Sequence, residues 1–356
     1  MDDRPRLTSR FQIGLLIIFS ALLGGCTYFR SDSEKPNTSA FDTAQIQKEM
    51  APLNLKTPYH PTKEIAAYFD FYQLNPPDVK HYFGTISSKN STLATHVFIP
   101  KNPKGTLFLI HGYFDHTGTF SRLISKSLAH HYAVVSWDLP GHGLSTGDRT
   151  DTGAFALCGE QFIDIVQRAE THLPAPFFLV THSTGCSIAL EYIQHAPTNT
   201  FSQFIFLSPL IRHAHWGWGK FGYTIAKPFV KTIRRREKKN SSDSEYLAFV
   251  KQDPLHSGLL SFEYLDDLYT WEKQIQKNSV WPESVLIIQG DHDTVVDWKY
   301  NLKFLRTKIK HPEIHIIPNA RHQLINESEE FRNQVFTLIF QQLESTETTP
   351  TKGETP

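Results

Sequence analysis

A serine, an aspartate and a histidine each follow an apolar run in the second half of the chain. These three residue types act together in nucleophilic catalysis. The serine, Ser183, lies in THSTG (181–185), between the apolar run 177–180 and a segment of helical period. A serine on such a strand-to-helix turn stands clear of a sheet, and the helix N-terminus behind it favours a developing negative charge. The pattern predicts that Ser183 is a nucleophile, although Thr181 occupies the place of the first glycine in G-x-S-x-G.

A serine hydroxyl needs a base to accept its proton and an acid to orient that base. The candidate acid, Asp293, lies in GDHDTVV (290–296) after one apolar run, and the candidate base, His322, lies in NARH (319–322) after the last run. Asp291 and Asp297 are alternatives for the acid. Both segments fall at the ends of expected strands, where open α/β sheets place their ligands.

The elements that must position these residues are apolar runs that alternate with segments of helical period. Six runs rich in Val, Ile, Leu and Phe predict central strands of a parallel sheet covered on both faces: 106–110, 132–136, 177–180, 204–207, 285–289 and 314–317. Upstream, 81–87 and 93–99 predict an antiparallel hairpin at the sheet edge. The alternation breaks between 214 and 280, where helical segments occur without a buried strand. We expect this stretch to be a cap inserted after the sixth strand.

Four motifs together resemble the α/β hydrolases of the monoacylglycerol lipase and lysophospholipase group. They are HGYFDH (111–116), DLPGHGLS (138–145), the serine turn, and the paired Asp and His segments. The resemblance spans about residues 82–343 and implies an α/β-hydrolase fold, with a mostly parallel eight-stranded sheet, helices on both faces and a helical cap. It further implies that Ser183 is the nucleophile, Asp293 the acid and His322 the base of one triad, in the chain order of these enzymes.

The same resemblance places an oxyanion hole at two backbone N–H groups. One belongs to Thr184, directly after the nucleophile, and the other to Tyr113, directly after His111-Gly112. The chain departs from the family at Thr181 and Cys186, where small residues, usually glycines, are common. These departures bear on rate and substrate more than on the reaction.

The reaction implied is hydrolysis of the acyl ester of single-chain lipids, either monoacylglycerols or lysophospholipids, through an acyl-enzyme on Ser183. It needs no metal or organic cofactor, and neither H-E-x-x-H nor a Cys/His zinc spacing occurs in the chain. Three alternatives remain open: a general esterase, an acyltransferase on the same triad, and a non-catalytic lipid-binding lipoprotein of the envelope. Cys158 and Cys186 are expected to fill helix faces rather than form a disulfide.

The N-terminus predicts export and a lipid anchor. Basic residues precede the apolar run 11–25, which is shorter than the about 20 residues of a spanning helix and fits a signal peptide. Cys26 ends LGGC (23–26), which resembles a bacterial lipobox whose Cys becomes lipidated, and Thr27 then favours the outer membrane of the cell envelope. The expected organisation is a signal peptide (1–25), the lipidated Cys and a tether (26–60), a hydrolase domain (61–343) with the cap at 214–280, and a disordered tail (344–356).

The charge of the chain balances, with 36 basic and 36 acidic residues. This excludes a non-specific nucleic-acid binder, which needs a basic excess. Within the cap, however, 227–239 carries seven basic residues and one acidic residue, shortly after the aromatic stretch 215–223. The aromatic stretch either packs the cap onto the core or forms an acyl channel or membrane-dipping lip. The basic run is either a solvated face or a surface for anionic headgroups. The expected partners are therefore an ester or lipid substrate and a membrane.

Overall fold

The computed structural model describes residues 40–57, 59–234 and 239–347. The predicted signal peptide, Cys26 and most of the predicted tether lie outside the described residues, as does the segment 348–356 of the predicted tail. No helix in the described part of the chain combines the length and the apolar character that crossing a membrane requires.

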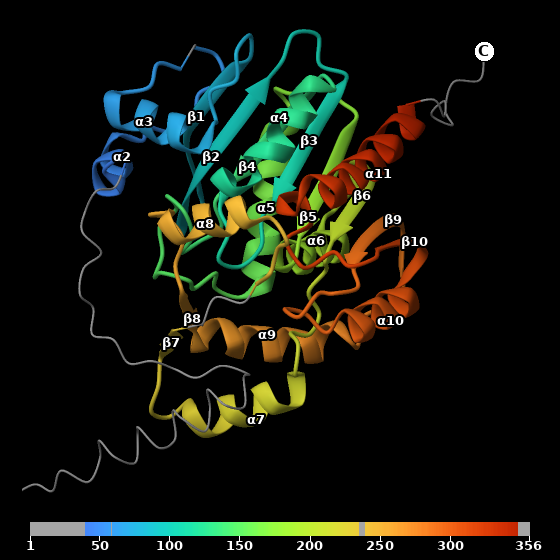
Figure 1. The fold of residues 1–356 in the computed structure, drawn as a ribbon. Helices are drawn as coiled ribbons and strands as arrows, with labels where there is room; N and C mark the ends of the chain where they lie inside the picture. Colours follow the sequence, from blue (N-terminus) through green and yellow to red (C-terminus); the bar gives the residue numbers. More distant parts are fainter. Residues whose placement is uncertain (1–39, 58, 235–238, 348–356) are drawn as a thin grey trace, which may run out of the picture.

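The centre of the molecule is an eight-stranded sheet in the order β1-β2-β4-β3-β5-β6-β9-β10 (Figure 1). β2 pairs antiparallel with β1 and with β4, and all other neighbours are parallel. The strands are β1 (Lys80–Ser88), β2 (Ser91–Ile99), β3 (Gly105–Ile110), β4 (Tyr132–Trp137), β5 (Phe177–His182), β6 (Phe201–Leu207), β9 (Trp281–Gly290) and β10 (Ile309–Ile317). The predicted hairpin, the six further strands and the α/β-hydrolase fold are confirmed.

Strand β3 shows how the sheet builds a core on each face. All its residues are buried; Phe108 and Ile110 join one apolar cluster, while Leu107 and Leu109 join the other, because successive strand residues point to opposite faces. The first cluster includes α5 (Phe155–Glu170), α6 (Thr184–His195) and α10 (Trp298–Lys308); the second includes α3 (Lys63–Tyr72), α4 (Ser121–Ala129) and α11 (Glu329–Glu347). Both faces of the sheet are therefore covered, as near-continuous apolar strands require.

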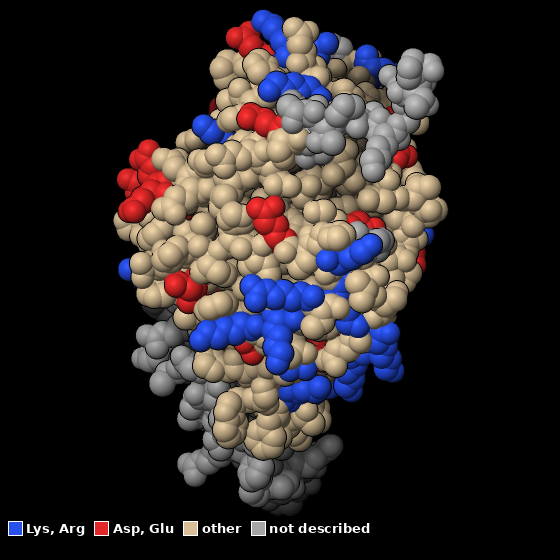
Figure 2. Space-filling model, turned by 90° about the vertical axis from the view of Figure 1, so that its right-hand side faces the viewer, with Lys and Arg blue, Asp and Glu red and all other residues tan. Residues whose placement is uncertain are grey.

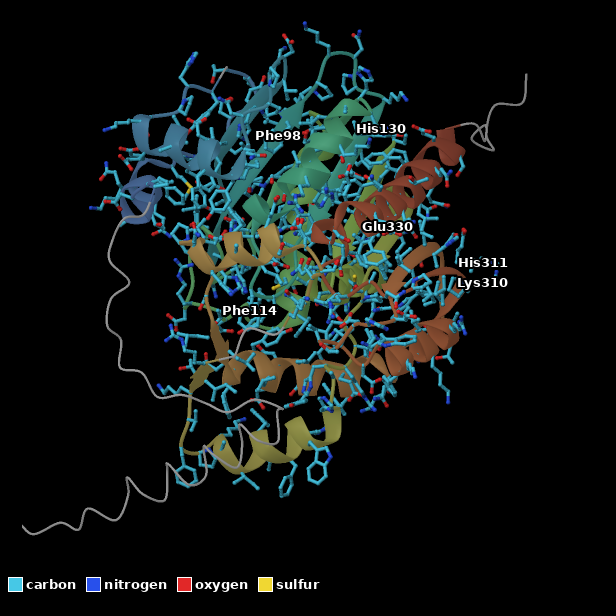
Figure 3. The ribbon with its side chains drawn as sticks, viewed as in Figure 1. Phe98, Phe114, His130, Lys310, His311 and Glu330 are labelled. Atoms are coloured by element: carbon cyan, nitrogen blue, oxygen red, sulfur yellow. The ribbon has the colours of Figure 1, made fainter. Side chains whose placement is uncertain are left out.

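Strand β10 forms one edge of the sheet. Lys310 and His311 project from this edge, away from the body of the molecule (Figure 3). A charged side chain on an edge strand hinders pairing with another chain. Helix α11 ends at Glu347, so the helix continues past the predicted domain end at residue 343.

The insertion between β6 and β9 contains α7 (Trp216–Ala226), β7 (Thr232–Arg234), α8 (Ser244–Gln252), β8 (Leu259–Ser261) and α9 (Phe262–Ile275). β7 and β8 form a small antiparallel pair, which the sequence pattern does not reveal because each has only three residues. Figure 1 shows α7 and α9 together, on the side where the parallel strands end. Helix α8 instead returns to the core, where the ring of Phe249 lies 5.6 Å from that of Phe71 in α3.

Residues 41–57, which the sequence prediction assigns to a tether, pack against the domain. Phe41 and Ile46, the latter in α2 (Thr43–Glu49), are almost completely buried in the second cluster. Thr85 of β1 accepts a hydrogen bond from Leu53 N–H and donates one to the carbonyl of Ala51. The tether boundary at residue 60 is therefore wrong for this stretch, because buried apolar side chains and edge-strand pairing outweigh its polar composition.

Candidate active site

Ser183 occupies the turn that joins β5 to α6. Its φ of 53° and ψ of −113° lie in a region that non-glycine residues rarely adopt. Its N–H donates to the carbonyl of Leu207 at 3.0 Å, which holds this backbone in place. The strained turn lifts Ser183 above the sheet at the head of α6, as the sequence predicts for a nucleophile.

Two glycines allow the backbone to crowd around this serine. A Cβ on Gly185 would lie 2.5 Å from the carbonyl oxygen of Ile110, which no side chain tolerates. A Cβ on Gly112 would lie 3.1 Å from Cβ of Ser183 and 2.9 Å from Nδ1 of His182. The loop after β3 therefore lies directly against the serine turn.

The two departures from the family pattern, Thr181 and Cys186, contact each other. The Thr181 hydroxyl donates to Sγ of Cys186 at 3.2 Å, and the thiol lies 3.4 Å from the Thr181 carbonyl. Both side chains are buried, and burial raises the pKa of Cys186 to about 12. Cys186 therefore packs against the serine turn as a neutral thiol. Cys158 and Cys186 are both free, buried cysteines.

His322 and Asp293 are in direct contact. Nδ1 of His322 donates to Oδ2 of Asp293 at 2.7 Å, which leaves Nε2 as the proton-accepting nitrogen of a neutral ring. The other oxygen of Asp293 accepts from the N–H groups of Val295 and Val296 at 2.7 and 3.1 Å. These bonds fix the carboxylate, and through it the imidazole.

The alternative carboxylates have other partners. Asp291 accepts the N–H of Asn319 at 2.7 Å, and Asp297 caps α10 by accepting the N–H of Tyr300. Of the three aspartates considered from the sequence, Asp293 is the one whose carboxylate meets His322.

Burial and pairing set the protonation of this pair. Burial lowers the pKa of His322, and the Asp293 carboxylate offsets this only in part, so the pKa stays below the usual histidine value. Burial alone would raise the pKa of Asp293, but the facing ring and the two amides outweigh it and hold that pKa below its usual value. Near neutral pH the pair is a carboxylate with a neutral imidazole, which is the state a general base requires.

The His322 loop is attached to the serine turn through backbone contacts. The carbonyl of His322 accepts from Nε2 of His182 at 3.1 Å and from the Ser208 hydroxyl at 2.9 Å. The rings of His182 and His322 lie 4.7 Å apart. Since His182 immediately precedes Ser183, the structure brings the predicted base beside the predicted nucleophile.

The predicted oxyanion donors lie on the two segments that flank Ser183. Thr184 is the first residue of α6, where backbone N–H groups have no acceptor within the helix. Tyr113 follows Gly112, which packs on Ser183. The segments are therefore placed as an oxyanion hole needs, with the dipole of α6 behind them.

Helix α9 covers both oxyanion segments, which the sequence did not indicate. The ring of Tyr264 stacks on that of Tyr113 with centroids 3.8 Å apart, and its hydroxyl lies 2.9 Å from that of Thr184. The hydroxyl of Tyr113 also accepts the N–H of Ser261 at 3.1 Å. No motif marks Tyr264, since it is one of several aromatic residues in a helical segment.

Other motif residues hold the surrounding loops. Asp115 is buried, lies 3.3 Å from Nδ1 of His182, and accepts the amide of Gln323 at 3.1 Å. His111 accepts the N–H of Leu139 at 2.9 Å. Phe114 lies toward the cap (Figure 3), where its carbonyl accepts from Nδ1 of His256 at 3.1 Å. Among the described residues, no cluster of three or more His, Cys, Asp or Glu side chains could hold a metal ion.

Two lipases are similar to this chain in sequence. A monoglyceride lipase from Saccharomyces cerevisiae is 30% identical over 277 residues, which cover 70% of this chain and 87% of the relative. A monoacylglycerol lipase from Mycolicibacterium smegmatis is 25% identical over 240 residues, covering 64% of this chain and 85% of the relative.

A solved structure agrees with these similarities. The crystal structure of a soluble variant of the Saccharomyces cerevisiae monoglyceride lipase, in complex with a substrate analog, superposes with a TM-score of 0.64 at 26% identity and covers 74% of this chain and 95% of the other. The sequence model of the family described as serine aminopeptidase, S33 (Hydrolase_4), matches residues 101–329. The chain belongs to this family of α/β-fold serine hydrolases.

Proposed function

We propose that the protein hydrolyses the acyl ester of single-chain lipids, monoacylglycerols or lysophospholipids, with Ser183, His322 and Asp293 as its triad. The observation that carries the proposal is the buried contact between His322 and Asp293, held beside the strained turn of Ser183. The lipid part of the proposal is supported by the relatives, two of which are lipases of monoacylglycerols.

The chemistry follows from the protonation states. Nε2 of His322 accepts the Ser183 proton as Oγ attacks the ester carbonyl, and the N–H groups of Thr184 and Tyr113 stabilise the oxyanion. Loss of one such donor typically costs about 2.7–4 kcal/mol of transition-state stabilisation. The imidazolium, stabilised by Asp293, then protonates the departing alcohol, and water activated by the same histidine releases the fatty acid.

A membrane setting is part of the proposal. Large apolar side chains on α7 are exposed: 61% for Trp218, 55% for Phe221 and 43% for Ile225, followed by 63% for Phe229 just past the helix. An exposed apolar patch of this kind suits insertion into a lipid interface. The lipidated Cys26 would hold the protein at the outer membrane, and Cys26→Ser would leave it unlipidated.

Basic side chains flank this surface. Figure 2 shows Lys and Arg gathered on one face of the molecule, on the side where Figure 1 places α10. On α10, Lys299, Lys303 and Arg306 are exposed and spaced to share one side of the helix. The predicted basic run 227–239 is described only in part, since residues 235–238 lie outside the described residues.

A hydrolysis panel tests the proposal. Purified protein and Ser183→Ala are assayed on monoacylglycerols, lysophospholipids, a short-chain soluble ester, and a monoacylglycerol with an added alcohol acceptor. We expect release of fatty acid from a single-chain lipid by the wild type and loss of this activity in Ser183→Ala. Preference for the short ester would indicate a general esterase, transfer to the alcohol an acyltransferase, and no turnover by the folded protein a lipid-binding role.

A further inference from the structure

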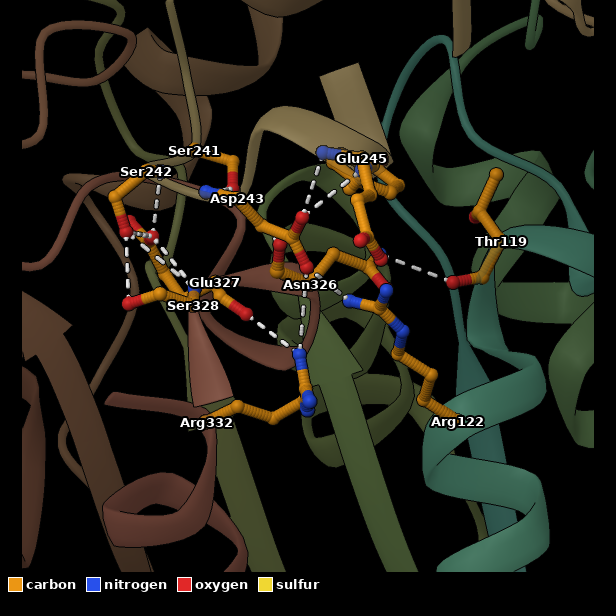
Figure 4. Close-up of polar contacts among 11 residues, drawn as sticks. Thr119, Arg122, Ser241, Ser242, Asp243, Glu245, Asn326, Glu327, Ser328 and Arg332 are labelled. Atoms are coloured by element: carbon orange, nitrogen blue, oxygen red, sulfur yellow. Dashed lines mark hydrogen bonds and ion pairs between the residues drawn. The ribbon is translucent and has the colours of Figure 1, made fainter. Parts of the chain in front are cut away.

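The loop that carries His322 is joined to a segment from the insertion, far away in the sequence. Figure 4 shows residues 241–243, just before α8, against residues 326–328, just before α11. Gln323 N–H donates to the carbonyl of Asn240 at 3.0 Å, and the Ser241 hydroxyl donates to the carbonyl of Asn326 at 2.8 Å. We call residues 240–243 the root segment. The catalytic loop thus has part of its backbone bonding supplied by the insertion.

Glu327 is the centre of this junction and is completely buried. Its Oε1 accepts the N–H of Arg321 at 2.6 Å, and its Oε2 accepts the N–H of Ser242 at 2.6 Å and also the Ser242 hydroxyl. One carboxylate therefore links the residue directly before His322 to the root segment. Each of its two oxygens accepts a backbone N–H at 2.6 Å, so the link between the two segments is short and direct.

The backbone on each side of His322 is then held by a different part of the molecule. The His322 carbonyl is fixed by His182, in the serine turn, and by Ser208, just after β6. On the other side, Glu327 holds the N–H of Arg321, in the peptide one residue before that of His322. Because a base must lie within hydrogen-bond reach of the proton it takes, displacement of this loop by about 1 Å is enough to slow the reaction.

We propose that Glu327 is a positioning residue for His322, and that through Ser242 it makes the placement of the base depend on the insertion. This rests on the proposed function, in which His322 is the general base. Glu327 acts on the imidazole through the loop backbone and has no contact with the ester in this role.

The same cluster provides a matched control. Asp243 accepts the N–H groups of Glu245 and Tyr246 at the start of α8, and Nη1 of Arg122 at 2.8 Å. It also lies 3.5 Å from Nη1 of Arg332, which donates to the carbonyl of Glu327. None of the bonds found among the described residues joins the Asp243 carboxylate to Arg321, His322 or the Glu327 carboxylate. Asp243→Asn therefore weakens the same junction but leaves the bonds of the Glu327 carboxylate in place.

The experiment compares Glu327→Gln with Asp243→Asn in the full chain. In Glu327→Gln, the NH2 group of the amide must face the N–H of either Arg321 or Ser242. One of these two hydrogen bonds is therefore lost. We expect kcat on a short soluble ester to fall about 10- to 100-fold in Glu327→Gln, with KM unchanged, as for a misplaced catalytic group. Asp243→Asn should lower the melting temperature and leave kcat as in the wild type. Ser242→Ala, which removes the hydroxyl arm alone, should lower kcat by a smaller factor.

A second readout does not depend on turnover. The proton shared by His322 and Asp293 gives a low-field NMR resonance, which should shift or broaden in Glu327→Gln and stay unchanged in Asp243→Asn. A Glu327→Gln protein with a wild-type resonance and wild-type kcat would overturn the proposal, as would equal losses of kcat in both variants. If the wild type has no esterase activity, the proposed function fails, while the resonance still decides whether Glu327 positions His322. If Glu327→Gln does not fold, Ser242→Ala with the same two readouts decides.

Discussion

At the scale of single residues, the proposed mechanism depends on a neutral His322. Its pKa lies below the usual histidine value because burial lowers it more than Asp293 raises it. The free enzyme should therefore gain activity as the pH rises through this pKa, and the midpoint of the rise should lie below the usual value of about 6.5. The pH dependence of kcat/KM on a soluble ester measures this. An acid limb centred well above neutral pH would contradict the neutral-base assignment.

Replacement of Asp293 tests its two effects on His322, which are to orient the ring and to raise its pKa. Without the carboxylate, the imidazolium loses the largest of its stabilising charges, so the pKa of His322 falls further, and the ring loses the bond that fixes its tautomer. Asp293→Asn should therefore lower kcat by about 10⁴-fold and move the acid limb to lower pH. The matched control is Asp291→Asn, whose carboxylate bonds Asn319 instead. Equal losses in the two variants would leave the acid unassigned.

The residues of the site differ in how far the sequence reveals them. Ser183 and His322 each follow an apolar strand in a recognisable motif, and the sequence is enough to single them out, whereas Asp293 was chosen through the family resemblance. Spacing left Asp291 and Asp297 open, because three carboxylates lie within one short loop and only side-chain direction separates them. Tyr264 and Glu327 could not be predicted. Their partners Thr184 and Ser242 are 80 and 85 residues away, and only the folded chain brings them together.

At the scale of elements, a buried ion pair attaches the α8–α9 connection to the core. The carboxylate of Asp253 accepts the Tyr72 hydroxyl at 2.5 Å and lies 2.9 Å from Nε2 of His116. Burial alone would lower the pKa of His116, yet Asp253 raises it above the usual histidine value. Burial alone would raise the pKa of Asp253, but His116 and Tyr72 hold it below its usual value. The insertion is therefore tied to α3 and to the loop after β3, as well as to the site.

Removal of this carboxylate should destabilise the fold. Asp253→Asn leaves His116 without its counter-charge, and breaking a buried pair typically costs about 3–5 kcal/mol. Chemical denaturation measures the loss. The control is Asp266→Asn, whose carboxylate is half exposed and pairs with Lys227, so its loss should cost at most about 1 kcal/mol. A similar small loss in both variants would show that the Asp253 pair is not structural.

The loss of unfolding free energy in Asp253→Asn should depend on pH in a defined direction. The raised pKa of His116 contributes stability that is complete below about 6.5 and is lost as the pH rises through the folded pKa. The lowered pKa of Asp253 contributes stability that is present above about 3.9 and is lost as the pH falls through its folded pKa. The difference between wild type and Asp253→Asn should thus be largest between these values. A deficit that grows steadily toward alkaline pH would be inconsistent with the pair.

The sequence predicts the strands better than it predicts how helices and loops pack against one another. The strands are visible because buried parallel strands need continuous apolar runs, and β3, β4 and β5 are buried along their whole length. The return of α8 to the core and the docking of residues 41–57 were not predicted. In each case a few aromatic or aliphatic side chains within a polar stretch, such as Phe249 and Phe41, determine the packing.

At the scale of the whole molecule, a chain with balanced charge carries exposed basic residues on α10 and exposed apolar side chains on α7, and we propose that this surface meets a lipid interface. Neutralising Lys299, Lys303 and Arg306 together should weaken binding to anionic vesicles, since each cation near such a surface contributes about 1 kcal/mol. The loss should be largest at low salt, where screening is least. The measurement is co-sedimentation with vesicles of neutral lipid alone or with an anionic lipid added.

The matched control neutralises Lys80, Lys101 and Lys104. These exposed lysines lie near the opposite ends of the strands, where β1 begins and β2 leads into β3. This triple variant should bind as the wild type does. Equal vesicle binding by the wild type and both triple variants would show that the basic face is an ordinary solvated surface. If binding is then lost in the double variant Trp218→Ser with Phe221→Ser, the membrane contact belongs to α7 alone.

The most direct test of the account is reaction with a fluorophosphonate probe, which forms a covalent bond only with an activated serine. The folded wild-type protein should react, peptide mass spectrometry should locate the adduct on Ser183, and Ser183→Ala should not be labelled. Absence of labelling in folded wild-type protein, or an adduct on another serine that persists in Ser183→Ala, would contradict the assignment of Ser183 as the nucleophile.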